Sequence, residues 1–105
     1  MTLDSLPALD PGDGEVQTAE VAVTDDVLVK AFGLGPGAAV EPHEHADATN
    51  VFHVLAGAVT VQRGDEAATV EAPGVVLNER GQVHGARNDG DEPAILTASL
   101  CPLPQ

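Results

Sequence analysis

The sequence predicts an all-β fold in a single domain of 105 residues. Two observations carry this prediction. Runs of β-branched and aliphatic residues are separated by Gly, Pro, Asp and Asn, and these turn signals recur about every 8 to 12 residues, which is typical of a β-sandwich or β-barrel. Because Gly or Pro interrupts every stretch with helical periodicity, we expect no helix of three turns or more.

The expected elements follow one another with short turns between them. Residues 1–14 are rich in Pro, Gly and Asp and are expected to form a loose lead-in, followed by one domain over residues 15–105. Strands are expected at 15–23, 27–34, 38–45, 50–57, 58–63, 67–71, 75–78, 83–88 and 94–100. Four glycines are interpreted as turn residues free to adopt positive φ, namely Gly37, Gly57, Gly74 and Gly81.

The composition limits both the core and the partners. Without Trp or Tyr, and with only Phe32 and Phe52, the core must be aliphatic, and the stacking platforms used on single-stranded nucleic acid are missing. A formal charge of −13 disfavours nucleic acid and anionic membranes as partners. The acidic residues are spread along the chain, so we interpret them as adaptation to high salt rather than as a surface for a basic partner or for steering cations.

Cellular location and cysteine chemistry are also constrained. Cys101 is the single cysteine, which excludes an intramolecular disulfide and argues against a zinc finger; we expect it to be a small residue near the end of the last strand. The N-terminal residues do not resemble a signal peptide, and no apolar run approaches the 18 residues of a membrane span. The expected location is the cytoplasm.

The histidines form the most informative pattern. His43 and His45 are two residues apart, so in an extended strand both rings lie on one face while Glu44 lies on the other. Two imidazoles on one face are a natural pair of ligands for a divalent metal. Alone, however, this pair could equally be a surface pair.

The spacing around the pair strengthens the metal interpretation. Residues 37–57 follow the pattern G-x5-H-x-H-x4-E-x6-G with one substitution, and residues 81–88 follow G-x2-H-x3-N. These are the first cupin motif and the end of the second, so the chain resembles the cupin superfamily. The resemblance implies a cupin-type double-stranded β-helix, a jelly-roll barrel around a metal. Its ligands would be His43, His45 and His84, with Asn50 at the position of the family's glutamate.

Asn50 is the main departure from the family pattern. An amide supplies a neutral, weaker oxygen than a carboxylate, so the site would be more positive and would leave coordination positions open. Some cupins, among them thiol and diketone dioxygenases, hold their metal with three histidines alone. Asn50 is therefore expected either to ligate the metal or to orient a ligand or water. Asp47 could supply the missing carboxylate, although a loop Asp more often serves a turn.

Four other polar residues have two interpretations each. Strand parity places His53 outward unless a β-bulge intervenes. The second motif is one residue short and has Glu79 where the family has proline; Glu79 is either a general base or a solvated loop residue. Arg80 and Arg87 could bind a carboxylate, but parity turns Arg87 outward. No catalytic residue is assigned from the sequence.

The fold alone does not determine the function. The preferred expectation is a metal-dependent enzyme of the dioxygenase type, using a divalent transition metal such as Fe, Zn, Ni or Mn on a small polar metabolite. The alternatives are a non-catalytic metal- and ligand-binding module for sensing or storage, and a barrel with vestigial histidines. Because a small jelly roll leaves strand edges unpaired, we also expect a homodimer.

Overall fold

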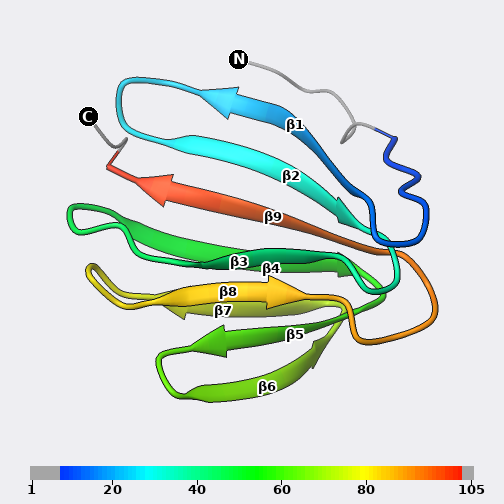
Figure 1. The fold of residues 1–105 in the computed structure, drawn as a ribbon. Coiled ribbons are helices and arrows are strands. Elements are labelled where there is room, and N and C mark those ends of the chain that lie inside the picture. The colour runs from blue at the N-terminus through cyan, green and yellow to red at the C-terminus, as the bar shows by residue number, and fades with distance from the viewer. Residues whose placement is uncertain (1–7, 103–105) are drawn as a thin grey trace.

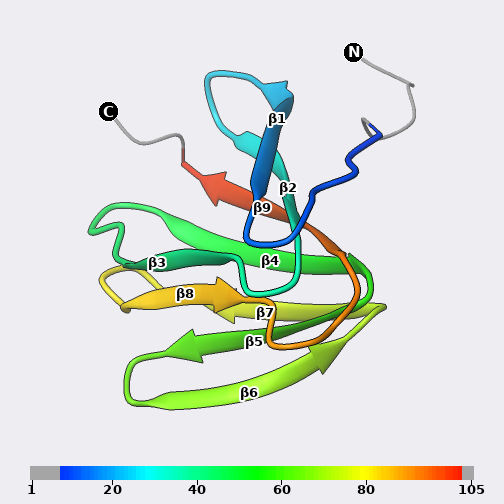
Figure 2. The same ribbon diagram turned by 45° about the vertical axis from the view of Figure 1, so that its right-hand side comes forward.

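The computed structural model describes residues 8–102, which form two facing antiparallel sheets (Figures 1 and 2). The described part of the chain contains strands and turns and no helix. The strands are β1 (Val16–Val23), β2 (Leu28–Leu34), β3 (Ala39–His43), β4 (Thr49–Ala56), β5 (Ala58–Arg63), β6 (Glu66–Glu71), β7 (Gly74–Asn78), β8 (His84–Arg87) and β9 (Ala94–Cys101). The predicted all-β jelly-roll barrel is confirmed.

The chain passes repeatedly from one sheet to the other. The five-stranded sheet has the order β1-β2-β9-β4-β7, and the four-stranded sheet has the order β3-β8-β5-β6. From β2 onward, every connection except the β5–β6 hairpin changes sheet. The connections therefore gather at two ends of the barrel, and the left-hand end in Figure 1 carries the β3–β4 and β7–β8 loops.

The core between the sheets is aliphatic, as the composition predicts. Alternate residues of each strand point inward, so β4 buries Phe52 and Val54 and leaves His53 exposed. Leu34, Val59 and Leu96 are fully buried beside them. The predicted outward position of His53 is confirmed, because the irregularity in the β4–β9 pairing falls only after Val54.

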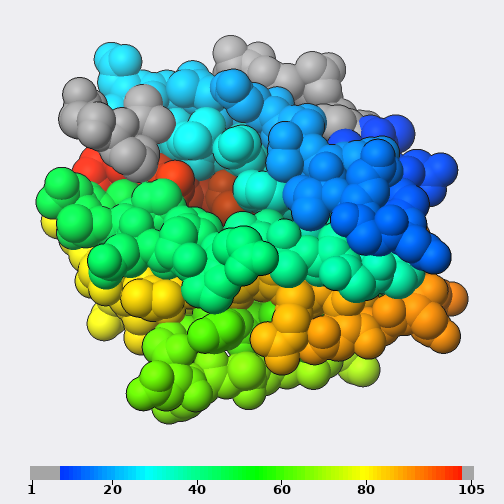
Figure 3. Space-filling view, viewed as in Figure 1, coloured from blue at the N-terminus to red at the C-terminus, as the bar shows by residue number. Residues whose placement is uncertain are grey.

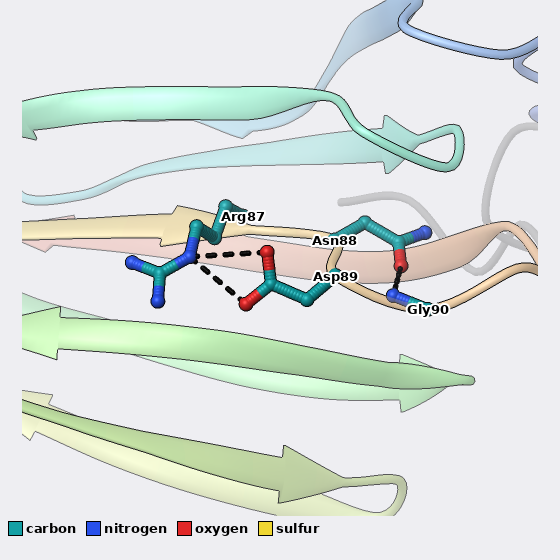
Figure 4. A network of polar contacts seen from close by, with 4 residues as sticks. All are labelled: Arg87, Asn88, Asp89 and Gly90. Carbon is teal, nitrogen blue, oxygen red and sulfur yellow. Dashed lines mark hydrogen bonds and ion pairs between the residues drawn. The ribbon is translucent and has the colours of Figure 1, made fainter.

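Asn88 closes the right-hand end of the barrel. Its side-chain nitrogen donates to the carbonyls of Leu34, at 2.9 Å, and Glu92, at 2.7 Å, and its side-chain oxygen accepts from the Gly90 amide at 2.9 Å. Figure 4 shows the bond to Gly90 beside the ion pair of Arg87 with Asp89. Asn88 is 1 % exposed, and both its side-chain nitrogen and its side-chain oxygen are hydrogen-bonded, so its role is to hold the β8–β9 loop against the end of β2.

The glycine predictions are confirmed at three positions and wrong at one. Gly37, Gly57 and Gly81 adopt positive φ. Gly74 does not: it begins β7, where a Cβ would collide with the side chain of Val70 and the carbonyl oxygen of Glu71. The reason for glycine at position 74 is thus the close approach of β6, and the turn conformation expected from the sequence is absent.

Two further features bear on the sequence predictions. Cys101 is the exposed last residue of β9, as expected. No helix of the described chain is long and apolar enough to cross a membrane. The loose lead-in expected over residues 1–14 lies partly outside the described residues, which begin at residue 8.

Candidate metal centre

Three histidines meet at the left-hand end of the barrel in Figure 1. His43 is the last residue of β3 and His84 is the first residue of β8, and the two are paired across these neighbouring strands. His45 follows two residues later in the β3–β4 loop. One ring nitrogen of each histidine lies within 4.8 Å of one nitrogen of each of the others. The structure therefore brings together the three predicted histidines.

The route to this cluster differs from the prediction for His45. We expected a strand through residue 45, with His43 and His45 sharing one face by parity. The strand instead ends at His43, and its register with β8 shifts between Val40 and His43. The His45 carbonyl accepts a hydrogen bond from the Gly81 amide at 2.9 Å, so the β7–β8 loop, rather than strand pairing, places His45.

Backbone hydrogen bonds set the orientation of two rings. The Nδ1 atoms of His43 and His84 each lie 2.9 Å from a backbone carbonyl, of Glu41 and Gln82 respectively. A carbonyl can only accept, so Nδ1 carries the proton and Nε2 keeps a free lone pair. His84 is 1 % exposed, and its Nε2 is buried without any hydrogen-bond partner. This nitrogen has the exposure, tautomer and surroundings of a metal ligand.

Electrostatics favour the neutral, ligating form of the rings. Burial lowers the pKa of His84 below its ordinary value, the hydrogen bond to Gln82 raises it, and neighbouring His43 and His45 lower it again, with a net downward shift. Burial, followed by the charge of His43, also lowers the pKa of His45. Because metal binding requires neutral imidazole, these shifts increase the fraction of ligating rings near neutral pH.

The cluster borders a cavity of about 190 Å³. Figure 3 shows the hollow between β2 and β3, with β9 recessed at its floor. The cavity is lined by Leu28, Lys30, Phe32, Val40, His43, His45, Asn50, Phe52, Ala98 and Leu100. The Phe52 ring also packs edge-on against His84, at 5.6 Å between centroids. His43 and His45 therefore face a small, mostly apolar space that opens at the barrel surface, whereas His84 does not line it.

Asn50 lines this cavity and is paired with a residue that the sequence did not indicate. Asn50 and Asn78 lie opposite each other on β4 and β7, and the Asn78 Nδ2 donates to the Asn50 Oδ1 at 2.8 Å. Both side chains are buried, and the Asn78 Oδ1 has no partner. Asn78 ends an expected strand and shares the inward face of Val76, so strand parity was the available signal.

The remaining candidates lie outside the cluster. Asp47, Glu79 and Arg80 are exposed loop residues, and none lines the cavity. Asp47 falls in the turn between β3 and β4, which agrees with the turn interpretation and not with ligation. Arg87 points outward as predicted and pairs with Asp89 at 2.9 Å. Lys30 lines the cavity and was missed, although its parity with Phe32 places it inward.

Comparisons with known proteins give the same assignment as the fold. A protein from Thermus thermophilus is 29 % identical, with 86 % of each chain covered and a TM-score of 0.82. A Klebsiella pneumoniae protein, described as uncharacterized with a double-stranded β-helix domain, is 28 % identical over 90 % of this chain and 78 % of that one, with a TM-score of 0.82. A predicted oxalate decarboxylase from Thermotoga maritima is 22 % identical over 86 % and 83 %, with a TM-score of 0.80; at that identity the likeness shows the fold alone.

No curated protein matches the sequence. The cupin domain family matches residues 31–100, which hold β2 through β9 for most of their length together with all three clustered histidines. The chain belongs to the cupin family.

Proposed function

We propose that the protein binds one divalent transition metal through His43, His45 and His84 and oxidises a small polar metabolite with dioxygen. The observation that carries the metal proposal is the buried Nε2 of His84, which has no hydrogen-bond partner. A buried polar atom without a partner is costly. A metal shared with the other two rings would compensate this cost.

The three histidine ligands would leave further coordination positions of the metal open. Three imidazoles suit Fe, Zn and Ni, and the part of the chain described here adds no carboxylate to the group. Ligands about 2.1 Å from one ion lie roughly 3 to 3.5 Å apart. Since the ligand atoms now lie within 4.8 Å of one another, metal binding would require the half-buried His45 and the exposed His43 to move slightly toward His84.

When bound, the metal would polarise a substrate oxygen, and a redox-active metal would also permit reaction with dioxygen. The chain's own residues hold the ligand rings in place and exclude water. Carbonyls of Glu41 and Gln82 hold the rings in the ligating tautomer. Phe52 covers the edge of His84 and keeps water from that side.

We propose that Asn50 contacts a bound water or ligand, and that its hydrogen bond to Asn78 determines which of its side-chain atoms is presented. Turning both amides by 180° preserves one hydrogen bond between them with donor and acceptor exchanged. The Asn50 oxygen would then occupy the position now held by its nitrogen and would be free of Asn78. This exchange would let Asn50 present either an acceptor or a donor to a bound water or ligand.

A non-catalytic role in binding a metal and a small ligand is the second candidate. It is favoured by one observation: no Asp or Glu lines the cavity within residues 8–102, so no carboxylate is placed there for proton transfer. Oxygen uptake separates the two candidates. The metal-loaded protein should consume dioxygen with at least one member of a panel of small diketones, thiols and hydroxy acids if it is an oxygenase.

The metal proposal is tested on protein purified without an affinity tag. We expect close to one equivalent of metal by elemental analysis, and a loss of most of it in His43→Ala. His53→Ala is the matched control, since His53 lies on the outer face of the same barrel and should leave the metal content unchanged. A His43→Ala protein with full metal content would rule out this centre.

We also propose that two copies associate through β7. This strand is at an edge of the five-stranded sheet and carries no charged residue, in a chain of net charge −13. Val75 is 63 % exposed and Leu77 is 50 % exposed, so a second copy would bury apolar side chains without bringing acidic groups together. Light scattering should give a dimer for the wild type and a monomer for Leu77→Lys; a wild-type monomer at high concentration would contradict the proposal.

A further inference from the structure

We propose that Lys30 binds an anionic group of the ligand in the histidine cavity, which makes the ligand class a short carboxylic acid with a second oxygen donor. The second donor rests on the proposed metal centre. The role of Lys30 itself rests on the charge and shape of the cavity.

Lys30 is placed inside the cavity by its strand. It lies on β2 between Leu28 and Phe32, which share its inward face, and all three line the cavity. Its Nζ lies 5.7 Å from the centroid of the Phe32 ring. The aliphatic stem can therefore cover the apolar wall while the ammonium group remains in the cavity. It is also the only lysine in the sequence.

No protein carboxylate forms an ion pair with this ammonium group in the described chain. The residue opposite it on β1 is Glu20, yet the two form no ion pair among residues 8–102. No acidic residue lines the cavity there, and Asn50 takes the place where the family has a glutamate. With neutral imidazoles the formal cavity charge is +1, from Lys30, and a divalent metal would raise it to +3. A partly enclosed site with that charge favours an anion.

The volume of the cavity and the composition of its walls narrow the class of ligand further. Its volume of about 190 Å³ is below the range of roughly 300 to 1,000 Å³ typical for drug-sized ligands. Apolar side chains make up most of its walls, namely Leu28, Phe32, Val40, Phe52, Ala98 and Leu100. These features fit a ligand with a short apolar body and a polar group at each end, such as a small dicarboxylate.

The test compares ligands that differ by one carboxylate. Malonate, succinate and glutarate are each titrated against their monomethyl esters by calorimetry, using untagged protein as purified. We expect at least one diacid to bind roughly ten- to a hundredfold more tightly than its ester, the range for a charge-assisted hydrogen bond. This ratio should fall to within about twofold in Lys30→Met and remain in Lys30→Arg.

Two matched variants control for charge and for the neighbouring strand. Arg87→Gln removes one positive charge outside the cavity, and Glu20→Gln removes the carboxylate opposite Lys30; both should keep the ratio. Lys30→Gln repeats the test if Lys30→Met fails to fold by circular dichroism. A wild-type ratio near one for all three diacids, or a ratio unchanged in the uncharged variant used, Lys30→Met or Lys30→Gln, would overturn the proposal.

A failure of the metal proposal remains distinguishable. If elemental analysis finds no metal, the proposed centre is wrong, whereas Lys30 can still be tested on protein treated with a chelator. Monomethyl malonate should then bind more tightly than dimethyl malonate in the wild type and not in Lys30→Met. Equal binding of both esters in the wild type would mean that Lys30 holds no anion.

Discussion

The two ends of the barrel interior each contain buried asparagine, and the contrast between them separates structure from function. At the right-hand end in Figure 1, Asn88 donates twice and accepts once. At the left-hand end, Asn50 and Asn78 make one hydrogen bond to each other, and the Asn78 Oδ1 has no partner. The nearby Nε2 of His84 is also unpartnered.

Buried polar groups in folded proteins are usually satisfied, so the exceptions are informative. The Asn88 end is complete within the protein and holds the β8–β9 loop in place. The histidine end is incomplete and borders a cavity that also contains the only lysine. We therefore expect changes at the first end to affect stability and changes at the second end to affect binding.

The largest stability effect is expected for Asn88→Ala. It would leave the buried Leu34 carbonyl without its donor and release the loop at Glu92 and Gly90. The free energy of unfolding, measured in urea, should fall by about 3 kcal/mol. Metal content per folded molecule should not change. A loss of metal without a loss of stability would reverse the assignment of the two ends.

A smaller effect on stability is expected when Asn50 and Asn78, the hydrogen-bonded pair at the histidine end, are both replaced. In the double variant Asn50→Leu with Asn78→Leu, apolar groups of similar shape replace one hydrogen bond and one unsatisfied oxygen. Such replacements can be nearly neutral, so the free energy of unfolding should stay within about 1 kcal/mol of the wild type. A fall as large as that of Asn88→Ala would show that the pair is structural.

The histidine end of the barrel should also make the free energy of unfolding depend on pH. The pKa values of His45 and His84 are lowered in the folded protein, so the unfolded chain takes up protons first as pH falls through its ordinary value of about 6.5. Stability of the metal-free protein should therefore be greatest above that pH and should decrease below it. Melting temperatures from pH 8 to pH 5.5 measure this. His53→Ala should keep the dependence, while His84→Gln should reduce it.

Added salt is expected to distinguish the two ends of the barrel least, because it should raise the melting temperature equally in variants of either end. The acidic residues that give the chain its charge of −13 are spread along the sequence, and no acidic residue of the described chain lines the cavity. Raising KCl to about 1 M, where the screening length is about 3 Å, should increase the melting temperature of the wild type. The increase should be equal in Asn88→Ala and in the Asn50→Leu, Asn78→Leu variant. No increase would remove the support for adaptation to high salt.

Strand periodicity and motif spacing predicted most of the fold and the histidine cluster. Alternation along β4 placed Phe52 and Val54 inward and His53 outward, because the strand has no bulge there. The family spacing joined His84 to His43, which the structure pairs across β3 and β8. The prediction for β4 depends on local strand geometry, whereas the meeting of His84 with His43 was implied by the resemblance to the cupin superfamily.

The errors and omissions depend on contacts between strands and loops, which the alternation along a single strand does not encode. The position of His45 depends on the Gly81 amide, and the need for Gly74 depends on the approach of Val70 and Glu71. Strand parity places Asn78 inward, but its contact with Asn50 can be inferred only once β7 is known to pair with β4. Parity alone could not show these contacts, and those of His45 and Asn78 also require the order of strands in the sheets.

The mouth of the cavity lies between strands of different sheets. β2 is hydrogen-bonded to β1 and β9, whereas β3 is hydrogen-bonded to β8, so no backbone ladder crosses the opening. The gap could widen through side-chain movement alone while both sheets stay intact. Ligand entry then requires no unfolding step, because the backbone hydrogen bonds of both sheets stay in place.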